Sequence, residues 1–210
     1  MMGLVKKDFY LAGVLFKSYL MILAVFVVLS LVGVYDGTFL ASFLSLMCIM
    51  LPVNVFSYDE QAKWDKYAAA LPGGRTGVVR ARYLFTLLVS LGSVALGGAA
   101  GALTFLLDPP ADTTLWEMVV SVTGASSVGI LLNAFLLPLM FKFGVQKGRL
   151  YMVLVFAVLF GALFGSVTFL ASMGGLETLA LPLVALPVVG LLALVPSYLL
   201  SLRVFRKKDL

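Results

Sequence analysis

The chain contains no histidine and only one cysteine among its 210 residues. Histidine is the commonest general base and metal ligand near neutral pH, so its absence removes the usual centre of both kinds of site. Cys48 has no second cysteine with which to pair, and this excludes a disulfide framework. We therefore expect no metal ion and no other cofactor to be bound by this chain.

Charge is missing from most of the sequence, although 62% of the residues are apolar. Six runs of 18 to 27 residues carry no charged side chain: Ser18–Tyr35, Gly37–Tyr58, Tyr83–Leu107, Met118–Phe141, Leu150–Leu176 and Thr178–Leu202. A membrane-spanning helix needs about 20 apolar residues. The pattern predicts an all-α, polytopic membrane protein that forms one transmembrane domain over residues 1–210. We place its spans near residues 18–35, 37–57, 83–107, 116–141, 150–172 and 179–202.

The fifteen basic residues lie in four short segments, which are residues 6–17, 63–82, 142–149 and 203–208. The predicted connections on the opposite side of the membrane carry five charged residues, and all are acidic: Asp36, Asp108, Asp112, Glu117 and Glu177. Lys and Arg in short loops stay on the cytoplasmic side of a membrane. Both termini are therefore predicted to be cytoplasmic. The net charge of +5 is spread over these loops, which favours contact with anionic lipid headgroups over binding to nucleic acid.

The absence of charge deep within the runs also limits the function. Ion-coupled transporters and proton pumps usually place ionisable groups inside their spans. An intramembrane serine protease needs a base beside its nucleophile, and no nucleophile–base pair is evident in the loops. The sequence has no Gly-Lys pair and thus no Walker-type phosphate-binding loop. If this chain moves a solute uphill, another polypeptide must supply the energy.

Two helix starts are suggested outside the uncharged runs. Residues 2–17 place Val5 and Phe9 on one helical face and Lys7 on another, which fits either a helix lying in the membrane interface or a plain charged flank. Thr113 or Thr114 could cap the fourth span, with Glu117 in its first turn.

The longest hydrophilic stretch is the predicted cytoplasmic loop at residues 58–82. Ser57 and Glu60 have the spacing of a capping box, and Asp59 precedes Lys63 by four residues, the spacing of a helical ion pair. Trp64, Tyr67, Ala68 and Leu71 recur at three and four residues, and Pro72-Gly73-Gly74 stops the pattern. We predict one amphipathic helix over residues 58–71. Its aromatic face fits an interfacial anchor, ordinary loop packing or a docking surface for a cytoplasmic partner.

A few polar and small residues stand out within the spans. Asn54 and Asn133 are expected to face the interior of the helix bundle, because an unpartnered amide in lipid costs several kcal/mol. They are candidates for the substrate pathway. Gly161 and Gly165 in the fifth span are four residues apart, a spacing that permits close helix packing, either within one subunit or between two.

The loop resembles the first cytoplasmic loop of small ABC-2 type transporter permeases. The similarity is carried by Asp59-Glu60, Trp64, Tyr67, Leu71-Pro72, Arg75, Val79 and Arg82-Tyr83. Leu137-Pro138 and the following residues to Gly144, together with Lys6-Lys7-Asp8 and the C-terminal Ser201-Leu202-Arg203, fit more weakly.

This resemblance implies a permease subunit that is not itself an enzyme. Such permeases pair as dimers, with the same or a similar chain, and work with two copies of a separate ATPase subunit that binds ATP and Mg²⁺. A helix in the first cytoplasmic loop sits in a groove on the ATPase, a role that would fall here on Asp59, Glu60, Trp64, Tyr67, Leu71, Pro72 and Arg75. The first and fifth spans are the expected dimer contacts.

Similar permeases lie in the bacterial plasma membrane and export peptides or confer resistance to membrane-active antibiotics. The few polar groups in the spans favour an amphipathic or apolar substrate. The rival hypothesis is a membrane-embedded binding or immunity protein that works without ATP.

Overall fold

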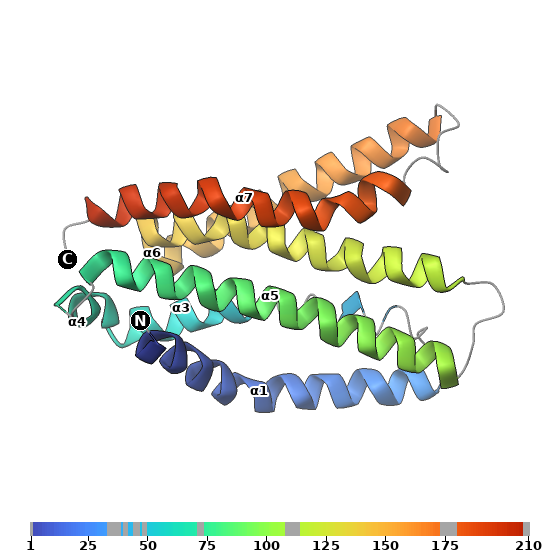
Figure 1. Cartoon of the computed structure of the whole chain (residues 1–210), viewed down its shortest axis with the longest axis horizontal. Coiled ribbons are helices and arrows are strands. Elements are labelled where there is room, and N and C mark those ends of the chain that lie inside the picture. Colours follow the sequence, from blue (N-terminus) through green and yellow to red (C-terminus); the bar gives the residue numbers. More distant parts are fainter. Residues whose placement is uncertain are drawn as a thin grey trace.

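The computed structural model describes residues 2–32, 39, 42–43, 47, 50–70, 74–107, 114–172 and 180–207. This part of the chain contains helices and no strands, as the sequence predicts. The helices are α1 (Met2–Leu31), α3 (Leu51–Gln61), α4 (Trp64–Ala70), α5 (Gly74–Leu107), α6 (Leu115–Ser172) and α7 (Ala180–Arg206). Figure 1 shows the long helices lying lengthwise beside one another, with α4 at one end.

Four helices within the described residues are long and apolar enough to cross a membrane. They are Met2–Phe26, Gly74–Ala99, Val119–Val145 and Pro187–Arg206, and they overlap the predicted first, third, fourth and sixth spans. The predicted fifth span overlaps a shorter apolar helix, Val153–Ala162. Most of the predicted second span lies outside the described residues, so the count of six remains a prediction.

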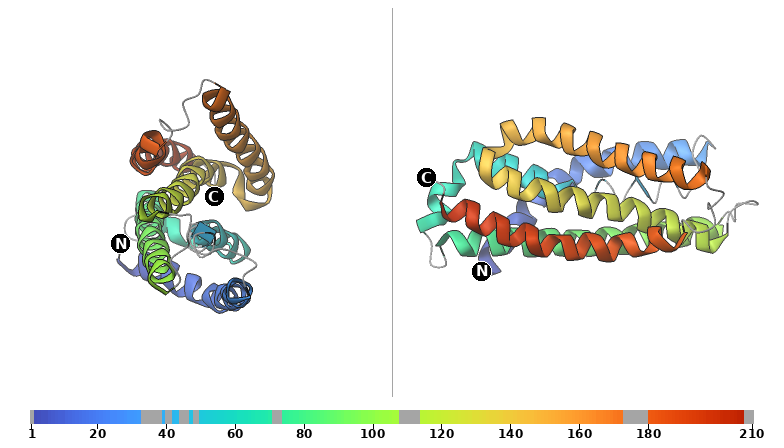
Figure 2. Two further views of the ribbon diagram at one scale, coloured as in Figure 1. Left: turned by 90° about the vertical axis from the view of Figure 1, so that its right-hand side faces the viewer. Right: turned by 90° about the horizontal axis from the view of Figure 1, so that it is seen from above.

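Helix α6 is two helices joined by a sharp turn. Gly144 has φ 78° and ψ 176°, which is not a helical conformation. Figure 2 shows the two arms, in yellow and orange, running in opposite directions. The predicted connection between the fourth and fifth spans is therefore helical on both sides of one glycine. Pro138 lies within the first arm, and the chain reverses at Gly144 instead.

The main apolar core joins α3, α5, the first arm of α6 and α7. Phe141 of α6 lies at its centre, with its ring centroid 4.9 Å from that of Phe56 and 5.1 Å from that of Phe205. Val79 and Leu136 are also fully buried in this core. It extends from Phe205 and Phe141 to Ile130 and Leu194 in the middle parts of α6 and α7.

Helix α1 is attached at the edge of this core. It runs unbroken from Met2, so the predicted approach segment and the predicted first span form one helix, and Figure 1 shows its first part tilted against the rest. The Phe9 ring packs edge-on against Phe85 of α5 at 5.0 Å, whereas Tyr10 is exposed. Farther along, the ring centroids of Phe26 and Phe43 lie 4.2 Å apart, which places this part of α1 beside residue 43 of the predicted second span.

The first arm of α6 begins with a reciprocal cap. The Glu117 backbone N–H donates to Thr114 Oγ1 at 3.3 Å, and the Thr114 backbone N–H donates to Glu117 Oε2 at 2.9 Å. This arrangement satisfies two backbone donors at the helix N-terminus. The predicted choice between Thr113 and Thr114 is thereby settled in favour of Thr114.

Candidate functional site

The loop predicted as one helix over residues 58–71 contains the ends of two helices. Helix α3 begins at Leu51, with Pro52 in its first turn, and continues through the predicted start to Gln61. Lys63 then takes a left-handed conformation with φ 49°, and α4 begins at Trp64. The predicted capping box is wrong, because Ser57 lies inside α3 and its Oγ donates to the Val53 carbonyl oxygen at 3.3 Å.

Asp59 is buried in a cluster of four charges rather than paired with Lys63. Its carboxylate accepts from Lys7 Nζ at 2.6 Å and from an Arg82 guanidinium nitrogen. Asp8 completes the cluster, with Lys7 Nζ at 3.2 Å and Arg82 Nη1 at 3.3 Å from its two oxygens. Two cations and two anions cancel, which is what makes burial of these charges tolerable. The cluster joins α1, α3 and α5.

Arg82 and Lys7 also lie over aromatic rings. The guanidinium carbon of Arg82 is 4.4 Å from the centroid of the Phe56 ring, and Lys7 Nζ is 4.7 Å from that of Trp64. A cation over an aromatic face is attracted by the negative charge density of the ring. These contacts extend the charge cluster, defined as Lys7, Asp8, Asp59 and Arg82, to both α3 and α4.

Glu60 binds the turn of α6. Its Oε2 accepts a hydrogen bond from the backbone N–H of Val145. Val145 follows Gly144 and is the first residue of the second arm. A carboxylate at a helix N-terminus satisfies an otherwise unpaired N–H and interacts favourably with the helix dipole. The end of α3 is therefore fixed both to the charge cluster and to the reversal between the two arms of α6.

Helix α4 has an inner and an outer face. Ala68 is fully buried and Trp64 packs against the main core, whereas Tyr67 is 70% exposed. The predicted single aromatic face is therefore wrong, since Trp64 and Ala68 point inward and Tyr67 points outward. Leu71 and Pro72 lie outside the described residues.

Two arginines at the start of α5 bind α7. Arg75 Nη1 donates to the Arg206 carbonyl oxygen at 2.6 Å, at the C-terminus of α7, where a positive charge is favourable. Arg80 Nε donates to the Tyr198 hydroxyl at 3.1 Å. These bonds and the contacts of Lys7, Asp59 and Glu60 join the helix ends that are predicted to be cytoplasmic.

The other predicted residues lie apart from this site. Asn54 Nδ2 donates to the Tyr19 hydroxyl of α1 at 2.6 Å, and Asn133 is 1% exposed, so both face inward as expected. Gly161 and Gly165 are exposed on the second arm of α6, and a Cβ at either position would meet nothing within 4 Å. The proposed roles of these four residues stay predictions.

Several residues of the site were not singled out by sequence reasoning. Asp8 was noted only as part of a weak similarity, Lys7 there and on one face of the expected helix at residues 2–17, and Gly144 only at the end of another weak similarity. One signal was available, because Asp8, Asp59 and Glu60 are three of the five acidic residues on the predicted side that carries all fifteen basic residues. Acidic residues in that setting indicate specific partners. Within the described part of the chain, no three His, Cys, Asp or Glu side chains are grouped so as to hold a metal ion.

The family model for "ABC-2 family transporter protein" matches residues 3–206. The chain belongs to the ABC-2 transporter family. Members of this family are generally non-catalytic membrane subunits of ABC transporters that work with an ATPase subunit. No curated protein and no solved structure matches the chain.

Membership of the ABC-2 family relates the contacts of α3 and α4 to a transport subunit. The match over residues 3–206 takes in all the helices named above, apart from the first residue of α1. Together with the apolar helices, it indicates a membrane-embedded protein. The contacts of α3 and α4 therefore belong to the end of a transport subunit at which three or more spanning helices are tied together.

Proposed function

We propose that this chain is the permease subunit of a bacterial ABC exporter that moves an amphipathic or apolar substrate across the plasma membrane. Two copies of a separate ATPase subunit supply the energy, and a second copy of this chain, or a similar one, completes the pathway. Both termini are cytoplasmic, on the same side as α4. The observation that carries this proposal is the attachment of α3 and α4 to α1, α5 and α6.

A short mechanical path follows from these attachments. The ATPase binds the outer face of α4, where Tyr67 is exposed, and displaces it. Trp64 and Ala68 fix α4 to the core, so the displacement passes to the end of α3. At that end, the ion pairs of Asp59 transmit the displacement to α1 and α5, and the hydrogen bond of Glu60 transmits it to the turn of α6. One movement at the surface thus reaches several spanning helices at once.

Tyr67→Ala is the sharpest test of docking on α4. An exposed aromatic side chain at the centre of an interface often contributes about 2 kcal/mol or more, so we expect ATPase association to fall by about thirtyfold or more. The tagged permease would be purified in mild detergent, and co-purifying ATPase and substrate-stimulated ATP hydrolysis would be measured. Trp64→Ala and Glu60→Arg would change the fold as well as docking, because Trp64 packs against the core and Glu60 caps a helix.

Tyr10→Ala is the matched control. Tyr10 is 79% exposed and lies on the first part of α1, so its removal should leave both the fold and the ATPase association unchanged. Equal and full transport by both variants would contradict docking at α4. If the wild type purifies without any ATPase and still functions in cells that lack one, the ATP-independent binding role replaces this proposal.

A further inference from the structure

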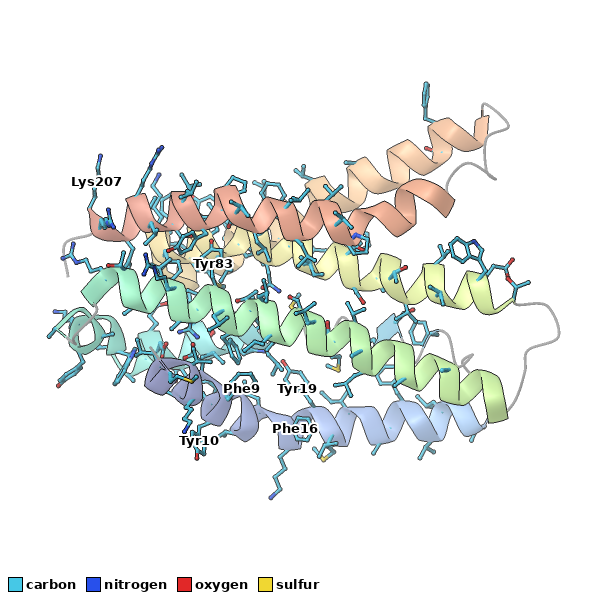
Figure 3. All side chains as sticks on the ribbon, viewed as in Figure 1. Phe9, Tyr10, Phe16, Tyr19, Tyr83 and Lys207 are labelled. Carbon is cyan, nitrogen blue, oxygen red and sulfur yellow. The ribbon has the colours of Figure 1, made fainter. Side chains whose placement is uncertain are left out.

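A cavity of about 440 Å³ lies between α1, α5 and the side chains of Phe43, Met47 and Leu51. Its walls include Phe9, Phe16 and Leu20 of α1, and Leu88, Gly92 and Leu96 of α5. Figure 3 shows Phe9 and Tyr19 projecting into the space between these two helices. The cavity is separate from the charge cluster and from the outer face of α4, and the proposed coupling path does not use it.

The cavity is long and narrow. Its lining extends from Phe9 to Leu20 on α1 and from Leu88 to Leu96 on α5, which is about 16 Å and 12 Å of helix at 1.5 Å per residue. An occupant that lies lengthwise between the two helices would therefore meet apolar side chains along its whole length.

The walls offer almost no hydrogen bonds to an occupant. The Tyr19 hydroxyl already accepts from Asn54 Nδ2 at 2.6 Å, and Ser93 Oγ donates to the Ser90 carbonyl oxygen at 2.8 Å. Water needs two to four polar partners to be stable in a cavity. Hydrocarbon needs none, and aromatic and aliphatic walls provide dispersion contacts along its length.

The rim of the cavity faces the surroundings of the bundle. Phe16 and Leu96, which both line the cavity, are 55% and 52% exposed. In a membrane-embedded helix, such apolar exposed residues lie against lipid chains. The chains that surround the protein are therefore the molecules with direct access to this space.

We propose that the cavity binds one acyl chain of a bilayer lipid, inserted between α1 and α5. The lipid completes the packing of α1, whose contacts with the rest of the described bundle include its first turns, Tyr19 and, farther along, Phe26. Binding requires neither ATP nor the ATPase, so this inference is independent of the proposed transport function.

Gly92→Leu tests the proposal, because a side chain at Gly92 would fill the cavity. A Cβ there meets nothing within 4 Å, so the variant should fold. Gly98→Leu is the matched control: it lies on the same helix, also has open space around its Cβ, and does not line the cavity. The probe is a phosphatidylglycerol with a photoreactive diazirine on one acyl chain, present as a minor component of phosphatidylcholine nanodiscs.

We expect cross-links on residues 9–20 and 88–96 that saturate and are competed by unlabelled phosphatidylglycerol. In Gly92→Leu the labelling should fall to the level found on the lipid-facing residues of α7, and in Gly98→Leu it should not change. Labelling spread evenly over all lipid-facing helices, or equal labelling in both variants, would overturn the proposal. If Gly92→Leu does not fold, competition by unlabelled phosphatidylglycerol on the wild type still tests the proposal, and labelling of the cavity residues that is not competed would overturn it.

A second arm separates a resident lipid from a transported one. The labelled permease is combined with its ATPase, and ATP is added before illumination. Labelling that persists through turnover supports a bound bilayer lipid. Labelling that disappears only with ATP assigns the cavity to a transported amphiphile and overturns the lipid assignment. Failure of the first arm would leave the docking of the ATPase on α4 untouched.

Discussion

Helix α1 and the pair formed by α5 and the first arm of α6 are similar in length and apolarity but are held in different ways. Within the most apolar window of each, 56% of the residues are buried in Gly74–Ala99 and 61% in Val119–Val145, against 6% in Met2–Phe26. The central pair is packed on many sides. Helix α1 is held by the charge cluster, the contact between Phe9 and Phe85, and the hydrogen bond between Tyr19 and Asn54.

This difference matters because lipid changes the balance of forces. Apolar surface gains little when it leaves lipid for protein, so close packing and polar contacts decide how helices associate in a membrane. The central pair has close packing. For α1 the polar contacts lie at its first turns and at Tyr19, and the cavity lies beside the segment from Phe9 to Leu20.

Arg82→Leu should have the largest effect, because it leaves Asp8 and Asp59 buried with Lys7 as the one cation of the cluster. Removing one member of a buried ion pair costs about 3–5 kcal/mol. For a chain of this size we expect the midpoint of thermal unfolding in detergent to fall by roughly 10 °C. Protease sensitivity of α1 should rise before that of α5 and α6.

Two further variants make this prediction specific. Arg80→Leu removes an exposed arginine that donates to Tyr198, and it should change the midpoint little. Asp59→Asn added to Arg82→Leu should restore part of the stability, because it removes the unbalanced negative charge. Equal destabilisation by Arg80→Leu and Arg82→Leu would show that α1 is not held by the buried cluster.

Gly144→Ala should have the next largest effect and should act on the central part of the molecule. A φ of 78° with a ψ of 176° is essentially restricted to glycine, and another residue there costs about 1–3 kcal/mol. The added Cβ would also lie 3.0 Å from Glu60 Oε1. The measurement is the thermal midpoint, with Gly161→Ala as the control.

The control separates strain from a general effect of replacing glycine. Gly161 is helical with open space around it, so alanine should be neutral or should stabilise the helix by up to about 1 kcal/mol. Adding Glu60→Ala to Gly144→Ala should relieve the close contact but not the backbone strain. A Gly144→Ala protein as stable as the wild type would mean that the turn between the arms is not fixed by this residue.

The sequence predicted the helices well because the relevant signal is local. An uncharged run of about 20 residues is sufficient to indicate an apolar helix, and four such helices are confirmed among the described residues. The cap at Thr114 follows from neighbours three residues apart. The family, inferred from the residues around Asp59 and Arg82, is confirmed as well.

The errors in the loop have the opposite cause. Asp59 and Glu60 were assigned local helical partners, but their partners come from distant parts of the chain: Lys7 is 52 residues from Asp59, and Val145 is 85 residues from Glu60. Long-range ion pairs and caps leave no periodic pattern in a single sequence. The predicted helix start at residue 58 was also wrong, because α3 runs from Leu51 to Gln61 and the sequence carries no stop signal at residues 57–58.

The orientation of the termini, the dimer and the coupling roles of Asp59, Glu60, Trp64, Tyr67 and Arg75 stay predictions. What the structure adds is a division among these residues. Asp59, Glu60 and Arg75 bind other helices of the same chain, whereas Tyr67 is exposed and available to a partner. Sequence spacing alone cannot make that distinction, since it depends on which face of α4 meets the core.

Tyr83→Phe should have the smallest effect of the three and sharpens the contrast between α1 and the central helices. The Tyr83 hydroxyl lies 2.6 Å from Ser197 Oγ and 2.8 Å from Ser201 Oγ of α7. Ser197 also donates to the Ala134 carbonyl oxygen, so it keeps a partner in the variant. The ring still packs edge-on against Tyr198 at 5.3 Å. We expect a loss of about 1 kcal/mol in the free energy of unfolding, or a few degrees in the thermal midpoint.

The control is Tyr198→Phe, which removes an exposed contact with Arg80 and should cost less. If Tyr83→Phe were as damaging as Arg82→Leu, polar contacts would hold the central helices as they hold α1, and the contrast between the two regions would fail.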